Sequence, residues 1–192
     1  MPETINKSIL QNYDTYKKVR YENKKITDNK IVLEKKKDKN NNFNYGNSPI
    51  RSNHVSDIEL IIEAHKIDIF KYGFKLRSLS ISERPFFRFD SSGGFHNNIS
   101  PIIPLTLRQV STPHFQFYDE LGHNTAYKTD VLKDVDIIDE LRENINKGIE
   151  IFCQESVIFT TENGMPLIER DTELLFKAQN IDPLIDENFN ES

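Results

Sequence analysis

The sequence predicts an α+β fold, a single domain in which a mostly antiparallel sheet packs on one or two helices. Two observations carry this prediction. Between residues 74 and 128, apolar and polar residues alternate with a period of two, which is typical of half-buried strands. After Asp130 the period lengthens, and the apolar residues from Val135 to Phe152 follow the spacing of an amphipathic helix. A chain of 192 residues is long enough for one such core, with length left for tails.

The composition fits a polar protein of the cytoplasm. No apolar run approaches the roughly 20 residues needed to span a bilayer, and the N-terminus lacks an apolar signal-peptide region. Cys153 is the single cysteine, so an internal disulfide and a zinc–cysteine site are excluded. We therefore expect a cytoplasmic protein without a membrane partner.

Charge is distributed unevenly along the chain. Residues 16–40 hold ten Lys or Arg and four acids, a net charge of +6, whereas residues 130–192 hold sixteen acids and five bases, a net charge of −11. Two interpretations stay open. The basic part binds a polyanion, or the two parts are solvated surface that neutralises itself.

The division of the chain follows from these patterns. The predicted parts are a basic, partly flexible N-terminal extension (1–50), the α+β domain (51–180) and an acidic tail (181–192). Short apolar runs between residues 16 and 37 predict a hairpin that turns near residues 27–29. The Lys- and Asn-rich stretch from Lys35 to Asn44 has little to bury and predicts a flexible loop.

Two helices are predicted on either side of the sheet. Over residues 56–70, Ser56 and Glu59 fit a capping box, and the apolar residues that follow lie near one face. The second helix covers residues 134–153, with acids near its start, where the helix dipole favours them. A further short helix is expected from Asp171.

The predicted strands span residues 74–81, 86–90, 105–110, 114–118, 125–128 and 157–161. In the first of them the apolar phase shifts between Leu76 and Leu79, which indicates a bulge.

Strands 86–90 and 114–118 predict a sheet with two different faces. Because alternate residues of a strand share a face, their phenylalanines point one way and their polar residues the other. We expect the phenylalanine face to build the core under the helices. The polar face then presents Arg88, Asp90, His114, Gln116 and Tyr118. The glycine-rich loop of residues 91–94 leads to His96 and Asn98, which are expected to fold over the same face.

These residue types suit a phosphodiester substrate and cleavage of RNA without a metal or other cofactor. Arg88 is predicted to bind phosphate, because a guanidinium holds an oxyanion through two hydrogen bonds. His96 and His114 would share the general acid and base roles, with Asp90 orienting one of them. The other predicted substrate-binding residues are Asn98, Gln116 and Tyr118. This interpretation requires the two histidines within one substrate's reach, in a concave and partly open site.

Two alternatives stay open for the same residues. His96, His114 and Asp90 form a mixed nitrogen and oxygen set of the kind that binds metal ions. A half-buried sheet also places polar residues outward without any function, and Arg88 and Asp90 would then form a simple ion pair.

The stretch of residues 88–126 carries a spaced pattern of chemically active residues. It reads Arg88, Asp90, Gly93, His96 and Asn98, then His114, Gln116 and Tyr118, then Gly122 and Ala126. In this pattern the chain resembles a family of small uncharacterised bacterial and phage proteins with Arg-x-Asp-x-x-Gly-x-x-His-x-Asn followed by His-x-His-x-Tyr. It departs at Gln116, where the family has a second histidine, so His96 would have to supply that role.

The resemblance implies a toxin–antitoxin or phage-defence component, in some members with a nuclease-like site. The expected function is therefore a small protein of bacterial or phage conflict that acts on an RNA-like or nucleotide phosphodiester, as a ribonuclease- or phosphodiesterase-like hydrolase. The alternative is a non-catalytic inhibitor or regulator, whose basic N-terminal and acidic C-terminal regions meet a protein or nucleic-acid partner.

Overall fold

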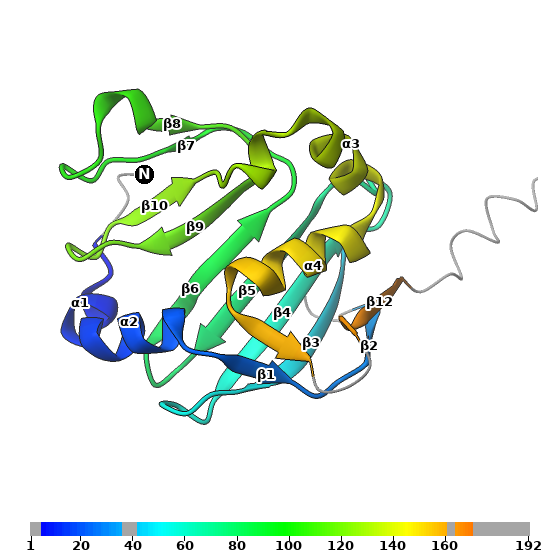
Figure 1. Ribbon diagram of the computed structural model, residues 1–192, viewed down its shortest axis with the longest axis horizontal. Helices are drawn as coiled ribbons and strands as arrows, with labels where there is room; N and C mark the ends of the chain where they lie inside the picture. Colours follow the sequence, from blue (N-terminus) through cyan, green and yellow to red (C-terminus); the bar gives the residue numbers. More distant parts are fainter. Residues whose placement is uncertain (1–4, 36–41, 161–163, 171–192) are drawn as a thin grey trace, which may run out of the picture.

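A 10-stranded sheet forms the centre of the computed structural model, which describes residues 5–35, 42–160 and 164–170 (Figure 1). Its strands are β1 (Lys24–Ile26), β2 (Lys30–Lys35), β3 (Phe43–Arg51), β4 (Ile58–His65), β5 (Tyr72–Ser78), β6 (Ser82–Asp90), β9 (His114–Tyr118), β10 (Asn124–Tyr127), β11 (Ile158–Thr160) and β12 (Leu167–Arg170). The main path runs β10-β9-β6-β5-β4-β3-β1-β11, and β2 pairs with β3 and β12. Among the described strands, only the pairs β1–β11 and β2–β12 are parallel, so the predicted mostly antiparallel α+β fold is confirmed.

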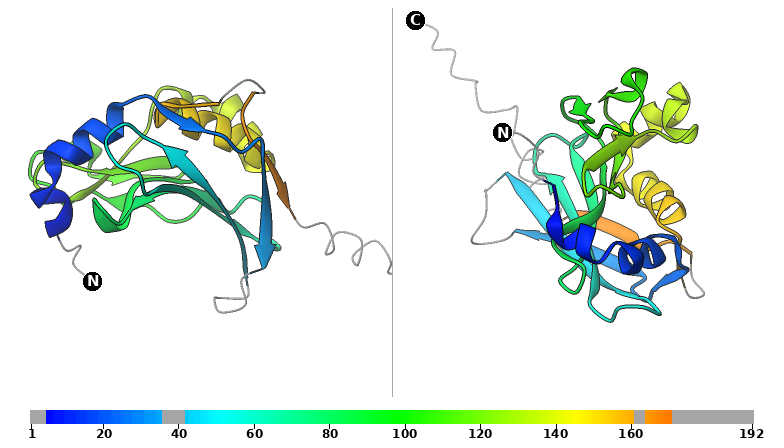
Figure 2. Two further views of the ribbon diagram at one scale, coloured as in Figure 1. Left: turned by 90° about the horizontal axis from the view of Figure 1, so that it is seen from below. Right: turned by 90° about the vertical axis from the view of Figure 1, so that its left-hand side faces the viewer.

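Helices cover one face of this sheet. The helices are α1 (Lys7–Gln11), α2 (Tyr13–Tyr21), α3 (Val135–Glu143) and α4 (Ile145–Glu155), with short 3-10 turns η1 (Leu105–Leu107) and η2 (Val131–Lys133). Figure 2 shows a strongly curved sheet, with α3 and α4 together on one side and α1 and α2 at one end. The opposite face of the central strands is therefore not covered by α3 and α4.

The covered face is built from stacked phenylalanines. The rings belong to Phe74, Phe87, Phe89, Phe115 and Phe152, and all five are 0% exposed. Phe152 of α4 lies 5.4 Å from Phe74 and 5.5 Å from Phe87, measured between ring centroids. Burying one such side chain stabilises the fold by about 1.5–3 kcal/mol. The phenylalanine face predicted from strands 86–90 and 114–118 thus forms the core.

The helix predicted over residues 56–70 is wrong, because this segment forms strand β4. Ile58, Leu60 and Ile62 are buried at alternate positions, which is the period of a strand. Ile61 also is apolar, so the run Leu60–Ile62 fits a helical period as well. The partners β3 and β5 on both sides decide between the two.

The long helix predicted over residues 134–153 is two helices, α3 and α4. Asn144 separates them and caps α4, because its side-chain oxygen accepts from the backbone N–H groups of Asn146 and Lys147. Asp134 caps α3 in the same way through Asp136 and Ile137. The helical period continues across Asn144, which is why the sequence alone does not reveal the break.

The described residues before position 51 belong to the same sheet and core, whereas the sequence predicts an extension there. Ile9, Tyr16 and Val19 are buried in the core, and β1, β2 and β3 are sheet strands. The predicted hairpin is also wrong. Residues 27–29 connect β1 to β2, but each of these strands pairs with β3 and not with the other.

Two basic residues of this region serve the fold itself. Lys24 is 0% exposed, and its Nζ donates to the backbone carbonyl groups of Val19 at 2.7 Å and Glu22 at 2.9 Å. It thereby satisfies acceptors at the C-terminal end of α2, and burial lowers its pKa to about 8. Arg20 is 4% exposed and lies over the ring of Phe87 at 3.7 Å. Neither residue is presented to a polyanion.

Some of the remaining predictions are confirmed, one differs from the structure, and others lie outside the described residues. The bulge in the strand after residue 74 is confirmed by a register shift between Leu76 and Ser78, and the strand over residues 125–128 by β10. Residues 105–110 form η1 and the short β8 (Gln109–Val110), which pairs only with β7 (His96–Asn97) within the described chain. The predicted helix from Asp171 and the acidic tail lie outside the described residues. Within the described ranges, every helix is too short or too polar to cross a membrane.

Gly148 of α4 provides a stability prediction. A Cβ at this position would lie 2.7 Å from the ring of Tyr72, whose hydroxyl donates to the carbonyl oxygen of Leu141. We expect Gly148→Ala to lower the free energy of unfolding by about 1–3 kcal/mol through overpacking, although alanine favours a helix by about 1 kcal/mol. Urea denaturation measures the difference. Gly94→Ala is the control, because a Cβ there meets nothing within 4 Å; a Gly148→Ala variant as stable as wild type would contradict the packing.

Candidate functional site

The face of strands β6 and β9 opposite α3 and α4 carries the predicted polar residues. The strands are antiparallel, with Arg88 opposite Gln116 and Asp90 opposite His114. Directly opposed residues of neighbouring strands have side chains on the same face. Arg88 and His114 therefore share one face, as the catalytic interpretation requires, and both lie next to Asp90.

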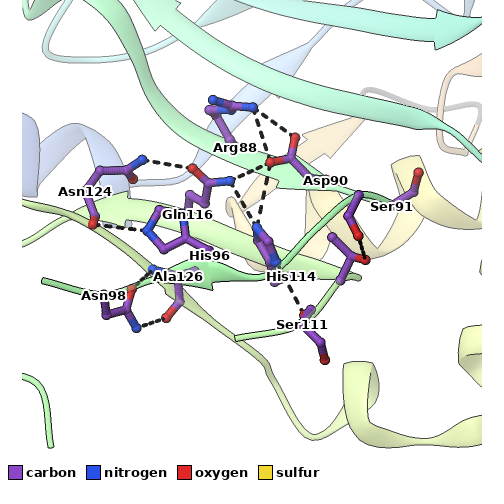
Figure 3. A network of polar contacts seen from close by, with 12 residues as sticks. Arg88, Asp90, Ser91, His96, Asn98, Ser111, His114, Gln116, Asn124 and Ala126 are labelled. Atoms are coloured by element: carbon purple, nitrogen blue, oxygen red, sulfur yellow. Dashed lines mark hydrogen bonds and ion pairs between the residues drawn. The ribbon is translucent and has the colours of Figure 1, made fainter. Parts of the chain in front are cut away.

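These four residues form one continuous polar network (Figure 3). Nη2 of Arg88 donates to both carboxylate oxygens of Asp90, at 3.1 and 3.2 Å. The side-chain amide of Gln116 donates to Oδ2 of Asp90 and lies 3.0 Å from Nε2 of His114. Its oxygen accepts from the amide of Asn124 at 2.9 Å. Gln116 therefore links the polar side chains of β6 to those of β9 and β10.

The network determines which nitrogen of His114 carries the proton. Nδ1 of His114 lies 3.3 Å from the carbonyl oxygen of Ser111, which only accepts, so Nδ1 must donate. Nε2 is then the acceptor for one N–H of Gln116. The other N–H of that amide goes to Asp90. With this assignment, each hydrogen bond of the network joins a donor to an acceptor. This holds only if His114 is neutral.

Burial favours the same neutral form. The side chain of His114 is 3% exposed, and desolvation lowers its pKa, while Asp90, whose Oδ2 lies 3.7 Å from Nε2, raises it by less. Both ring nitrogens of His114 are engaged. A general base needs a free lone pair within reach of its substrate, and Gln116 already uses the lone pair of Nε2.

His96 and Asn98 come from the segment after the glycine-rich loop. The ring of His96 lies 5.9 Å from that of His114, edge to face, and its Nε2 lies 3.3 Å from the carbonyl oxygen of Asn124. The two histidines are thus as close as the catalytic interpretation requires. Asn98 is 2% exposed, and its amide donates to the carbonyl oxygen of Ala126 and accepts from the N–H of Ala126.

Asn98 therefore acts as a substitute strand partner for β10, the terminal strand of the sheet path. It satisfies backbone groups that an edge strand otherwise leaves open. A third hydrogen bond, to the carbonyl oxygen of Leu107 at 2.8 Å, ties η1 to the same place. In this structure Asn98 joins the 96–110 segment to the sheet, which differs from the predicted role in substrate binding.

A cavity on this face lies beside Arg88, and neither His96 nor His114 lines it. This cavity, of about 250 Å³, is lined by Arg84, Pro85, Phe86, Arg88, Gln116, Tyr118 and Asn124. The structure thus brings together three predicted residues, Arg88, Gln116 and Tyr118. Tyr118 is 6% exposed, so it contributes mainly wall to the cavity.

Arg84 and Asn124 are site residues that the sequence prediction did not include. Arg84 is four positions before Arg88 on β6, and both line the same cavity. Asn124 pairs with Tyr118 across the β9–β10 hairpin. The period-two pattern does not indicate Arg84, because the alternation breaks at Phe86 and Phe87, which are both buried. The turn at residues 119–123 indicates Asn124 only once the register is known.

Neither the alternative metal site nor a thiol nucleophile is supported by the described residues. Among the described residues, no group of three or more His, Cys, Asp or Glu is placed to hold a metal ion, so the alternative set of His96, His114 and Asp90 is not assembled as one. The amide of Gln116 lies between Asp90 and His114 instead. Cys153 is fully buried, and burial raises the pKa of its thiol to about 12, so it presents no thiolate.

Comparison with known proteins adds no relative. No protein-family model matches the chain, and no curated protein or solved structure shows significant similarity to it. The resemblance of residues 88–126 to a bacterial and phage family therefore stays a prediction.

The lowered pKa of His114 predicts a pH dependence of stability. The unfolded chain takes up a proton near the usual pKa of 6.5, whereas folded His114 resists protonation. The contribution of neutral His114 to stability is therefore complete above pH 6.5. It is lost as the pH falls from 6.5 through the lower pKa of the folded state. We expect His114→Asn to lose less unfolding free energy than wild type between pH 7.5 and pH 5, measured by urea denaturation. His54→Asn, at a 42% exposed side chain, controls for losing a histidine. Equal pH slopes in wild type and His114→Asn would refute a buried neutral His114.

Proposed function

We propose that the protein binds an RNA-like or nucleotide phosphodiester in the cavity beside Arg88. One observation carries this proposal: two guanidinium groups, of Arg84 and Arg88, line a concave site together with the neutral hydrogen-bonding side chains of Gln116, Tyr118 and Asn124. Arginine suits phosphate because its planar fork of donors matches two oxyanions at once.

Asp90 orients Arg88 for this role and leaves other donors of its guanidinium available. The carboxylate holds only Nη2, while the buried Nε has no hydrogen-bond partner in the described part of the chain. The side chain of Arg88 is 36% exposed, so its remaining donors reach solvent. A cation fixed in one orientation loses less conformational entropy when a ligand binds. With Asp90 counted, Arg84 and Arg88 leave one net positive charge, which suits a single phosphate group.

The same geometry favours binding without hydrolysis. His114 does not line the cavity, and its Nε2 accepts from Gln116, so it offers no lone pair to a substrate. Hydrolysis remains the second candidate, because His96 and His114 are close enough to act on one phosphate. It would require the Gln116 amide to leave His114. Three further parts of this proposal rest on the sequence alone. They are a place in bacterial or phage conflict, a protein partner and a cytoplasmic location.

Binding of adenosine monophosphate and of a short RNA, followed by NMR titration, tests the proposal. Charge-assisted hydrogen bonds contribute about 1.5–3 kcal/mol, so we expect Arg88→Gln to weaken binding by about tenfold or more. Arg77→Gln is the matched control, since Arg77 lies on the neighbouring strand β5 and is paired with Glu59. Equal losses in both variants, or no phosphate-dependent binding by wild type, would sink the proposal.

Incubation with total RNA, with and without a divalent metal ion, separates binding from hydrolysis. We expect binding without cleavage. Cleavage that disappears in His114→Ala and His96→Ala, but not in His54→Ala, would establish the hydrolytic candidate instead.

A further inference from the structure

A second cavity, of about 640 Å³, is lined in part by residues 125–127 of strand β10. Its walls come from β9 and β10, from the 98–111 segment, from Lys128 and from Lys133 of η2, from the end of α2 and from Glu155 of α4. It shares no lining residue with the cavity beside Arg88. The inference drawn from it is therefore independent of the phosphate site.

Most of its lining is apolar. The larger apolar and aromatic side chains are those of Tyr21, Ile103, Leu107, Val110, Phe117 and Tyr127. Pockets for small ligands have volumes of about 300–1,000 Å³ and walls of this kind, with a few polar groups that orient the ligand. The volume and the lining thus match a small organic molecule with an apolar body.

Positive charge is concentrated around this apolar space. Lys128, on the wall, has no carboxylate within ion-pair distance among the described residues, and its nearest polar contact is the carbonyl oxygen of Thr112 at 3.5 Å. Partial burial also lowers the pKa of Lys128. A cation placed in this way lowers the free energy of a bound anion.

Arg20 adds a second, rigid cation to the inner wall. Its guanidinium donates to the backbone oxygen of Glu155 at 3.0 Å and to the hydroxyl of Tyr127 at 2.9 Å. The Glu155 carboxylate lies 3.4 Å away and also accepts from Tyr127. Nε of Arg20 has no partner among the described residues, although the side chain is only 5% exposed. The carboxylate of Glu155 is thus already engaged. Lys133 also lines the cavity, but its Nζ pairs with Asp130 at 2.8 Å, so Lys128 is left to meet a ligand charge.

We propose that this cavity binds a small organic anion with a flat apolar body, whose acidic group pairs with Lys128 while its ring contacts Phe117 and Tyr127. A neutral ligand would leave Lys128 unpaired, and a purely polar anion would leave the apolar walls hydrated. The side chains exposed on the nearby segment, such as Leu105, which is 76% exposed, form a separate surface outside the cavity.

The test uses two probes that share their aromatic body. 1-Anilinonaphthalene-8-sulfonate carries a sulfonate, and N-phenyl-1-naphthylamine lacks it, and fluorescence titration of the full chain gives both affinities. We expect saturable binding of the sulfonate at one site. Lys128→Gln should weaken it by about fivefold, in line with a partly exposed ion pair, and should leave the neutral probe unchanged.

Matched variants locate the probe. Gln109 is an exposed cavity residue, and Gln109→Glu adds a negative charge without a change of shape, so the sulfonate should bind several-fold more weakly. Gln11→Glu makes the same change on α1, at an exposed residue outside the cavity, and should have no effect. Three outcomes would overturn the proposal: no saturable binding, sulfonate affinity that is the same in Lys128→Gln as in wild type, or binding lost in Leu105→Ser and kept in the cavity variants.

Discussion

The two-residue repeat of strand β6 is the constraint from which the arrangement of this molecule follows. Phe87 and Phe89 are both fully buried, against Phe152 and Phe115. A shift of one residue in the register would bury Arg88 and expose both rings, at a cost of several kcal/mol. The aromatic core therefore determines that Arg88 and Asp90 lie on the face opposite α3 and α4. The polar site is a consequence of the packing on its other side.

Gln116 gives that face its chemical character. A carboxamide donates and accepts at once, and here it contacts Asp90, His114 and Asn124. It forms hydrogen bonds with Asp90 and His114, two buried or half-buried groups that would otherwise bind a proton or a water molecule. A second histidine at this position would compete for the same proton as His114. The glutamine instead makes a fixed hydrogen-bond network, which orients Arg88 through Asp90 and favours binding over proton transfer.

The strands with a clean alternation could be predicted from the sequence, since only one of their faces is buried. Strands β6 and β9 and the shared polar face of Arg88 and His114 follow directly from that pattern. Strand β4 could not, because the run Leu60–Ile62 is apolar at both parities and its identity depends on partners distant in sequence. Strands β1 and β2 could not be predicted for the same reason, because their partners include β11 and β12 near the other end of the described chain. Burial of His114, and the lining of the cavity by Arg84 and Asn124, depend on three-dimensional packing that periodicity does not encode.

The central claim is that Gln116 holds His114 neutral, with the proton on Nδ1. Nitrogen-15 NMR of the histidine rings at neutral pH measures this directly, because protonated and unprotonated ring nitrogens have well separated shifts. The structure predicts a protonated Nδ1 and an unprotonated Nε2 for His114, and a change in this state in Gln116→Leu. A doubly protonated ring, or a proton on Nε2, would contradict the network and would return His114 to the list of candidate acid–base groups.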